Sequence, residues 1–326
     1  TQIICYTIGV RSYKLKNINT LIEFMEFFKD EETCIEYVKS IKFKDGEYCP
    51  HCGCKKVYTY KDGKLYKCSK CRKQFTIKVG TIFGDSKIPL KKWLLAIFLL
   101  WTNHKGISSV QLAEQVGVTQ KTAWFMAQRI REAYERGENI FGGIVEVDET
   151  YIGGKDKNKH SKKKSKTRGG FNKEAVLGIV ERRGNLRFEH IGETNRYTVS
   201  KALSGKFNSD TVVITDETTV YDKIIKNKNR KTVNHSKNEY VNGEIYTNTI
   251  EGAFGIVKRT IFGVYHFVSR KHLQRYMNEI AFRYNIRELN NFDKVNLCLY
   301  NMNNRLRYGD LIGCREQNEK LQYSKI

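Results

Sequence analysis

The sequence Cys49-Pro-His-Cys52 is followed, after the 15 residues 53–67, by Cys68-Ser-Lys-Cys71, and these two pairs decide the fold of the N-terminal part of the chain. Two C-x₂-C pairs at this separation are typical of a zinc site with four thiolate ligands. The surrounding segment has little apolar sequence, so the bound metal supplies much of its folding free energy. We therefore predict a zinc ribbon over residues 43–83, with Cys49, Cys52, Cys68 and Cys71 as the zinc ligands.

The remaining cysteines show no paired spacing. The chain has 9 cysteines, and those outside the two pairs are Cys5, Cys34, Cys54, Cys298 and Cys314. Clustered cysteines that bind metal, rather than form disulfides, are typical of a reducing compartment, so we expect an intracellular protein. Cys54 forms a Cys-x-Cys with Cys52 and is the alternative ligand. The C-x₂-C spacing of Cys49 and Cys52 favours Cys52.

The charge of the chain points to a polyanionic partner. Lys and Arg number 58 against 35 Asp and Glu, a formal net charge of +23 over 326 residues. Basic side chains that neutralise phosphates release condensed counterions, which favours binding to nucleic acid. The alternative is that part of the lysine content reflects genomic composition. The hydrophobic fraction of 40% is enough for a buried core, and the most apolar run, 93–101, is too short to span a bilayer.

The segment after the ribbon has the pattern of a helix-turn-helix. Gly117 permits a sharp turn after a first short helix, and Thr119 can cap a second helix that carries Lys121 and Arg129. A polar second helix after such a turn is typical of DNA-binding motifs, and we expect both basic residues to contact DNA. A plain helical hairpin is the alternative.

Beyond residue 143 the pattern alternates between strands and helices. The apolar runs 144–148 and 211–216 each end in an aspartate, Asp148 and Asp216, as expected for strands that deliver carboxylates to the rim of a sheet. Glu251 lies in a predicted helix. Hard oxygen donors that converge from two strands and a helix suit Mg²⁺ or Mn²⁺ and a phosphate substrate. Taken singly, each acid is more often a cap, a turn residue or a solvated charge.

Several motifs of this region occur together and in one order. They are Val145-Glu-Val-Asp-Glu-Thr-Tyr-Ile-Gly-Gly-Lys155, Val176-Leu-Gly-Ile-Val-Glu-Arg182, Thr215-Asp-Glu217, Thr247-Asn-Thr-Ile-Glu-Gly252 with Lys258-Arg259, Gly263-Val-Tyr-His-Phe-Val-Ser-Arg-Lys-His-Leu-Gln-Arg-Tyr276, and Phe282-Arg-Tyr-Asn285. Together they resemble the ISXO-type insertion-sequence transposases, bacterial relatives of the eukaryotic Merlin elements. The similarity extends over about residues 20–288, and the order of zinc ribbon, helix-turn-helix and catalytic core is that of the family.

The resemblance implies a multidomain α/β protein whose catalytic core is an RNase H-like mixed sheet with a DDE metal site. Carried over by motif, Asp148 and Asp216 are the two aspartates, and Glu251, which follows Asp216 by 35 residues, is the third acid. Asn248, one helical turn before Glu251, is the alternative third ligand. The resemblance implies catalytic Mg²⁺ or Mn²⁺ beside the structural Zn²⁺.

Basic residues near these motifs are expected to contact DNA. Lys258 lies on the same helix face as Glu251 and matches a basic residue of the family thought to touch DNA. The loop 155–168 carries eight Lys or Arg in 14 residues, which favours backbone binding over a solvated charge run. His266 and His272 are either phosphate contacts or packed side chains. The expected DNA contacts are Lys121, Arg129, Lys162, Lys163, Lys164, Lys258 and Arg259.

The expected domains are an N-terminal helical segment (1–42), the zinc ribbon (43–83), the helix-turn-helix region (84–138), the RNase H-like catalytic domain (139–290) and a C-terminal tail (291–326). The resemblance implies a transposase that binds terminal inverted repeats of double-stranded DNA and catalyses metal-dependent phosphodiester hydrolysis and strand transfer. We expect a homo-oligomer on DNA, in the cytoplasm or at the nucleoid. Two other classes stay open. One is a DNA-binding regulator with an inactive core, which the three acids disfavour. The other is an RNase H-like nuclease such as a resolvase, for which two DNA-reading modules are surplus.

Overall fold

The computed structural model describes residues 18–133, 140–153, 173–222, 224–225, 230–233, 246–303 and 305–313. The chain forms two compact units, one of residues 135–288 and the other of residues 2–134 together with 289–326. In the described part, none of the helices has both the length and the apolar character needed to cross a bilayer.

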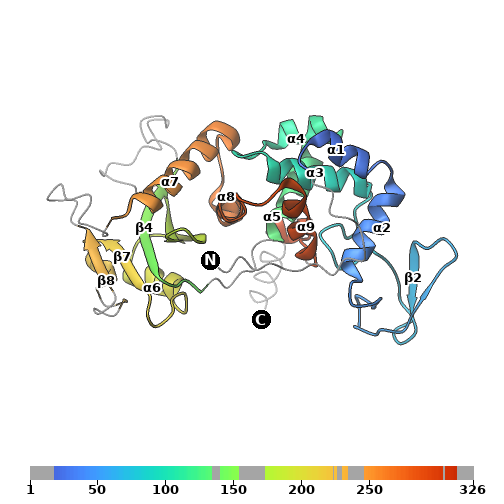
Figure 1. The fold of residues 1–326 in the computed structure, drawn as a ribbon, viewed down its shortest axis with the longest axis horizontal. Coiled ribbons are helices and arrows are strands. Elements are labelled where there is room, and N and C mark those ends of the chain that lie inside the picture. The colour runs from blue at the N-terminus through green and yellow to red at the C-terminus, as the bar shows by residue number, and fades with distance from the viewer. Residues whose placement is uncertain are drawn as a thin grey trace, which may run out of the picture. The chain divides into compact units, whose positions relative to one another are not determined.

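A five-stranded mixed sheet forms the centre of the unit 135–288 (Figure 1). Its strands are β4 (Ile144–Ile152), β5 (Glu174–Glu181), β6 (Leu186–Gly192), β7 (Val212–Asp216) and β8 (Arg230–Val233), in the order β6-β5-β4-β7-β8. The pairs β4/β5 and β5/β6 are antiparallel, whereas β4/β7 and β7/β8 are parallel. This sheet confirms the predicted mixed α/β class.

Helices cover both faces of this sheet, which explains why β5 is apolar almost throughout. On one face Val145, Val147, Leu177 and Ile179 pack with α6 (Arg196–Leu203) and with Tyr221 of a short 3₁₀ turn, Thr219–Tyr221. On the other face Ile152, Val176 and Val180 pack with α7 (Asn248–Thr260) and α8 (Leu273–Asn285). Between α7 and α8 lie a π-helical turn, Ile261–Tyr265, and a 3₁₀ turn, Arg270–His272.

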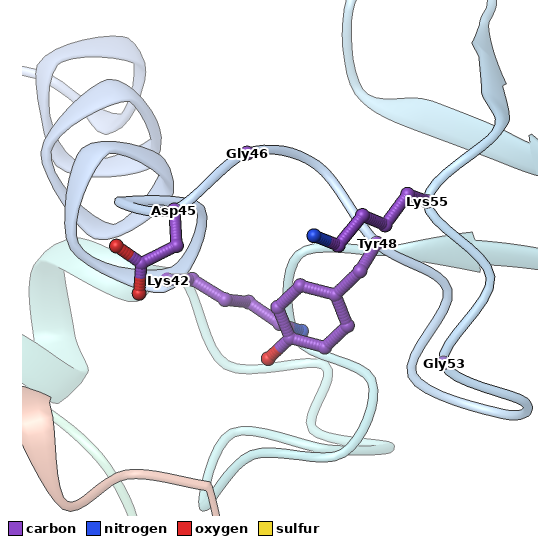
Figure 2. Close-up of a pocket in the computed structure, with 6 residues that line it drawn as sticks. All are labelled: Lys42, Asp45, Gly46, Tyr48, Gly53 and Lys55. Carbon is purple, nitrogen blue, oxygen red and sulfur yellow. The ribbon is translucent and has the colours of Figure 1, made fainter.

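The other unit begins with two capped helices and a small sheet. Helix α1 (Leu21–Phe27) has a capping box between Thr20 and Glu23, and α2 (Glu31–Lys42) is capped by Asp30. Strands β1 (Val57–Thr59), β2 (Leu65–Cys68) and β3 (Gln74–Thr76) form an antiparallel sheet in that order. Lys42, at the end of α2, lines a pocket of about 320 Å³ beside this sheet, together with Asp45, Gly46, Tyr48, Gly53 and Lys55 (Figure 2).

Three helices follow the small sheet. Helix α3 (Leu90–Thr102) is the apolar run of the sequence, and most of its side chains are buried. Helices α4 (Ser109–Val116) and α5 (Gln120–Glu132) are capped by the hydroxyls of Ser108 and Thr119. Gly117 joins them at φ 67°, a left-handed conformation that glycine adopts without steric cost. The two helices and their turn lie where the sequence pattern predicted them.

The C-terminal segment differs from the predicted tail. Residues 291–313 include α9 (Asn291–Tyr300) and α10 (Tyr308–Ile312), and they belong to the same unit as the N-terminal helices. The Tyr37 hydroxyl donates a hydrogen bond to Asn296, and the Met302 carbonyl accepts one from Ile82 at 2.9 Å. Residues from both ends of the chain therefore build one core.

Candidate zinc and catalytic sites

The four predicted cysteines gather at the base of the small sheet. Their sulfur atoms all lie within 4.8 Å of one another, and no other group of this kind occurs among the described residues. The distances are 3.6 Å between Cys49 and Cys71 and 3.6 Å between Cys52 and Cys68. Tetrahedral zinc with Zn–S bonds of about 2.3 Å separates its sulfur ligands by about 3.8 Å. The donor set and its spacing therefore fit a zinc ion.

Backbone N–H groups stabilise the thiolate form of one ligand, Cys68. Cys68 Sγ accepts hydrogen bonds from the backbone N–H groups of Cys71, at 3.4 Å, and Lys70, at 3.3 Å, and these bonds lower the pKa of Cys68. Cys54 is not in the cluster, and its sulfur lies 3.7 Å from the Ser69 hydroxyl. Of the two candidates, Cys52 is thus the one at the site.

Asp148 and Asp216 occupy matching positions on two adjacent parallel strands. The pairing of β4 with β7 includes Glu146 opposite Ile214, and each aspartate follows its member of this pair by two residues. Side chains two residues apart on a strand share a face. Asp148 therefore lies on the face of Ile152, which packs against α7 and α8, and Asp216 lies on the same face. Both aspartates are half-buried.

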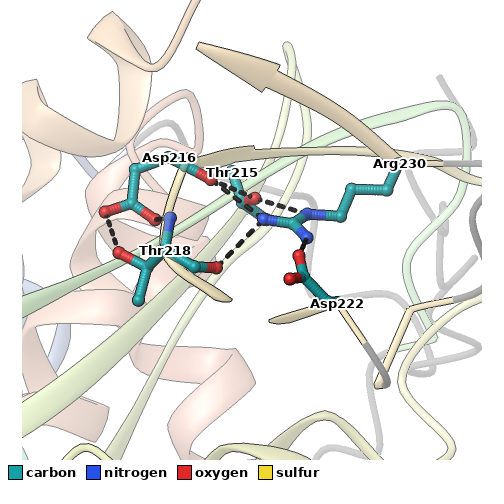
Figure 3. A network of polar contacts seen from close by, with 5 residues as sticks. All are labelled: Thr215, Asp216, Thr218, Asp222 and Arg230. Atoms are coloured by element: carbon teal, nitrogen blue, oxygen red, sulfur yellow. Dashed lines mark hydrogen bonds and ion pairs between the residues drawn. The ribbon is translucent and has the colours of Figure 1, made fainter. Parts of the chain in front are cut away.

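A polar network holds the end of β7 that carries Asp216 (Figure 3). Thr218 donates its backbone N–H to Asp216 Oδ1 at 3.1 Å and its hydroxyl to Oδ2 at 2.6 Å. Arg230 donates to Thr215 Oγ1 at 2.9 Å, to the Asp216 carbonyl at 3.0 Å and to the Thr218 carbonyl at 3.1 Å, and it pairs with Asp222. Arg230 thus fixes the strand end.

The helix that carries Glu251 is attached to the sheet through Glu146. The Glu146 carboxylate, which is fully buried, accepts the backbone N–H groups of Thr249 at 2.9 Å and Ile250 at 3.0 Å, and it pairs with Arg182 at 2.8 Å. The first N–H groups of a helix have no partner within it, so this carboxylate acts as the cap of α7. Glu251 is exposed one turn into the helix and accepts the Thr247 hydroxyl at 3.3 Å.

A glycine brings α7 close to the strand pair. Gly178 on β5 is the register partner of Asp148 on β4. A Cβ atom at Gly178 would lie 2.6 Å from Ile250 Cδ1 and 2.8 Å from Phe254 Cε1. Only a residue without a side chain allows this approach, so the position next to Asp148 sets the height of the helix above the sheet.

A second acid, Glu149, lies next to Asp148 and is half-buried on the other face of the sheet. The pKa of Glu149 is raised to about 7, first by burial and then by the charges of Asp148 and Asp216, while the Tyr221 hydroxyl acts in the opposite direction. Burial likewise raises the pKa of Tyr221. The Glu149 Oε1 and Tyr221 Oη atoms are both shielded from solvent. Glu149 is therefore no surface charge.

The three predicted acids lie on adjoining elements but are not a preformed ion cage. Among the described residues, Asp148, Asp216 and Glu251 do not form a group gathered closely enough to hold a metal ion. Oxygen ligands of one Mg²⁺ lie about 2.1 Å from the ion and hence within about 4 Å of each other. A shared ion would need these side chains to come closer together, and Glu251 is exposed with one hydroxyl as a hydrogen-bond donor to it. Asn248, the alternative ligand, is also exposed on α7.

The expected DNA contacts differ in their placement. Lys121, Lys258 and Arg259 are exposed. Arg129 is 5% exposed, and it donates to the carbonyls of Ile82, Gly84 and Leu306 at 3.0, 2.7 and 3.1 Å. This placement corrects the expectation that Arg129 binds DNA, because its donors are used inside the protein. Lys162, Lys163 and Lys164 lie outside the described residues.

The cysteine cluster of the small sheet and the two aspartates of the mixed sheet each lie in a segment that matches a known domain family. Residues 140–285 match the family model of the ISXO2-like transposase domain, and residues 29–74 match that of the transposase zinc-ribbon domain. The chain thus carries an ISXO2-like transposase domain and a transposase zinc-ribbon domain, as its motifs indicated.

Two further similarities accompany the family match. A protein in the transposable element ISH50 of Halobacterium salinarum is 26% identical over 273 residues, which cover 78% of this chain and 91% of the relative. The crystal structure of the Mos1 strand transfer complex aligns with 59% of this chain and 75% of its own, at 13% identity and a TM-score of 0.21. The second similarity is too low to carry an argument.

Proposed function

We propose that this transposase cleaves DNA at the ends of an insertion sequence and joins them to target DNA, with Asp148, Asp216 and Glu251 as the acids of its active site. The observation that carries the proposal is the matched placement of Asp148 and Asp216 on parallel neighbours, below a helix that Glu146 fixes to the same strand. The strand order is β6-β5-β4-β7-β8. When the strands of this sheet are numbered from 1 along the chain, the order is 3-2-1-4-5, which supports an RNase H-like core.

Divalent ions are the cofactor that this donor set suits. Mg²⁺ or Mn²⁺ bound by these carboxylates would activate an attacking hydroxyl and stabilise the leaving oxygen on phosphorus. The chain itself contributes the three carboxylates as hard oxygen ligands. The hydrogen bonds at the end of β7 orient Asp216, and the attachment of α7 to the sheet positions Glu251. Glu251 is proposed as the third ligand over Asn248, because a carboxylate binds Mg²⁺ more tightly than an amide.

DNA recognition is proposed for the zinc ribbon and for the helix pair α4–α5. The capped start of α5, with Gln120 and Lys121, is exposed, while the helix is buried from Ala123 through Ile130 except at two half-buried aromatics. A helix-turn-helix presents the N-terminal residues of its second helix to base edges. The exposed start of α5 therefore supports base contacts there, in a homo-oligomer that pairs the two ends.

The test uses labelled duplexes that carry the inverted repeats flanking the gene, incubated with the full chain and Mg²⁺ or Mn²⁺. Cleavage with strand transfer is expected for the wild type. Asp148→Asn and Asp216→Asn should each lower cleavage by about 100-fold or more while end binding persists, since several kcal/mol of charge stabilisation depends on the bound ions.

The same assay separates the other classes. The exposed Glu217 lies next to Asp216, so Glu217→Gln is the matched control and should retain cleavage. Cleavage without strand transfer would indicate a nuclease, and end binding without cleavage would indicate a regulator. A comparison of Glu251→Gln with Asn248→Ala identifies the third ligand, because only the loss of a ligand should raise the metal concentration needed for cleavage.

A further inference from the structure

Two phenylalanines beyond the C-terminal end of α7 are exposed to solvent. Phe262 is 55% exposed and Phe267 is 75% exposed. They flank the turn that follows α7, five residues apart in the sequence. Single exposed apolar residues are common, but two large rings that are each more than half exposed on one short turn gain little from the hydrophobic effect in this chain. The pair therefore indicates a ligand rather than a role in packing.

The turn between the two rings has a strained backbone. The Phe267 N–H donates to the Tyr265 carbonyl at 2.6 Å across His266, whose φ is 58° and ψ is −48°. A γ-turn with positive φ at a residue other than glycine is rare and unfavourable. The His266 ring nitrogen Nδ1 lies 3.2 Å from the Phe262 carbonyl oxygen, so the turn is also tied to the first phenylalanine.

Two buried charged side chains of α8 support this turn. The Tyr265 hydroxyl donates to the Glu279 carboxylate at 2.5 Å and accepts from Arg283 at 3.2 Å. Glu279 is fully buried, Arg283 is 9% exposed, and the two form an ion pair. The ring of Tyr276 packs edge-on against Tyr265 with centroids 4.7 Å apart. The two phenylalanines therefore stand on a fixed support, which lowers the entropy lost on binding.

The sequence segment that contains the two rings carries only positive charges. From Gly252 to Asn278 the sequence contains no Asp or Glu, and its basic residues are Lys258, Arg259, Arg270, Lys271 and Arg275. Lys258, Arg259 and Lys271 are exposed, and Arg270 pairs with Glu174 while its side chain stays 72% exposed. Exposed aromatic rings near exposed cations are typical of surfaces that stack bases and bind the phosphates between them.

Glu251 and Lys258 lie on one face of α7, and Phe262 follows in the π-helical turn Ile261–Tyr265 directly after the helix. Glu251, Lys258 and Phe262 are all exposed and follow one another at i, i+7 and i+11. Eleven residues at about 1.5 Å each span about 16 Å, or roughly five steps of B-form DNA at 3.4 Å. A strand cleaved near Glu251 would thus pass the two rings a few nucleotides away.

We propose that Phe262 and Phe267 form a stacking site for unpaired nucleotides of the DNA on which the enzyme acts. The inference rests on the proposed function for its partner. Bases inside a duplex hide their faces in the stack, so only unpaired bases can lie on these rings. Because every base has a π-face, the site tolerates any sequence and complements the sequence-specific contacts made elsewhere.

The experiment measures binding of the full, zinc-loaded chain to a mixed-sequence 12-nucleotide single strand with a central 2-aminopurine, without Mg²⁺ or Mn²⁺. Phe262→Ala and Phe267→Ala should each weaken binding about tenfold or more and reduce the quenching of 2-aminopurine. Phe262→Trp and Phe267→Trp should retain binding, whereas the Leu variants should behave as Ala because they lack a ring. Binding to a fully paired duplex should change less than about threefold.

Tyr197→Ala is the matched control, since Tyr197 is 76% exposed on α6 of the same unit. Thermal melting of each variant shows that the fold is kept. Wild-type affinity of both alanine variants for the single strand would overturn the proposal. So would a change of their oligomeric state without DNA, which would make the surface a contact between copies. Stacking by a wild type that fails to cleave would refute the proposed function alone, and cleavage by a wild type that shows no stacking would refute this inference alone.

Discussion

Glu146 on β4 and Thr249 on α7 are joined by two hydrogen bonds, from the Thr249 backbone N–H and from its hydroxyl, both 2.9 Å long. The same strand carries Asp148 two residues later, and the same helix carries Glu251 two residues later. One buried carboxylate thus connects the elements that bear two of the three proposed metal ligands. The Arg182 guanidinium completes the arrangement, because it pairs with Glu146 and stacks on the Tyr246 ring at 3.6 Å.

Loss of the Glu146 charge should loosen α7 from the sheet. We expect Glu146→Gln to lower the free energy of unfolding by about 1–3 kcal/mol and Glu146→Ala by about 3–5 kcal/mol, because Arg182 is then left without its buried partner. Urea unfolding measures the change in stability. The cleavage assay should show reduced cleavage as well, because Glu251 is then held less firmly. The exposed Glu217→Gln should change stability by less than about 0.5 kcal/mol. Wild-type behaviour of Glu146→Gln would show that α7 is held elsewhere.

Gly178→Ala tests the close approach of α7 from the other side. The new methyl group would lie 2.6 Å from Ile250 Cδ1, so helix and sheet must separate. Overpacking of this kind costs about 1–3 kcal/mol, and we expect reduced cleavage together with the lower stability. Gly252→Ala, on α7 itself, is the control. Nothing lies within 4 Å of a Cβ there, and alanine should stabilise the helix by about 0.5–1 kcal/mol. Equal stability of the two variants would contradict the packing argument.

The sequence predicted those features that depend on local spacing. Two C-x₂-C pairs specify the zinc ligands by themselves, and the apolar runs that end in Asp148 and Asp216 predict two of the strands. Asp216 is the last residue of β7 as expected, whereas β4 continues to Ile152, four residues beyond Asp148. The sequence also contains a signal for Glu146, because an acid between two valines in a buried strand needs a polar partner. Its partners, Thr249 and Ile250, lie more than 100 residues further along the chain.

Features that depend on distant segments could not be predicted. Arg129 has the spacing of a surface cation on a DNA-reading helix, but carbonyls of residues 82, 84 and 306 surround it only after the C-terminal segment has packed. The helices of residues 291–313 are short and weakly periodic, so their burial, not their pattern, stabilises them. The role of Arg230 at the end of β7 could not be predicted either, because it depends on the pairing of β8 with β7.

Zinc removal and single cysteine substitutions should distinguish the ligands from their neighbour. Cys52→Ser should lose bound zinc and unfold the ribbon, because the metal supplies much of the folding free energy of so small a sheet. Cys54→Ser, two residues away, should keep its zinc and its stability, since Cys54 lies outside the cluster. Zinc content by atomic absorption and melting with and without chelator measure both. Retention of zinc in Cys52→Ser with loss in Cys54→Ser would reverse the assignment.

Lys42 should make the stability of the ribbon-bearing unit depend on alkaline pH. Its ammonium group is buried and donates to the carbonyls of Ile77 at 2.7 Å and Val79 at 2.6 Å. Burial lowers the pKa of Lys42 from 10.5 to about 8. Between these two values the folded chain has released the proton and the unfolded chain has kept it, so the unfolded state binds more protons. The free energy of unfolding therefore rises with pH across this window.

We expect the stability of the wild type relative to Lys42→Met to increase between pH 8 and pH 10.5 by up to about 3 kcal/mol. A neutral amine still has two N–H donors for the two carbonyls, so deprotonation removes the cost of the buried charge without loss of either hydrogen bond. Urea unfolding at several pH values provides the measurement, and the difference between the two proteins cancels the titration of all other groups. The exposed Lys44→Met should follow the wild type at every pH. A constant difference between wild type and Lys42→Met would mean that the pocket beside Lys42 admits enough water to keep the ammonium group solvated.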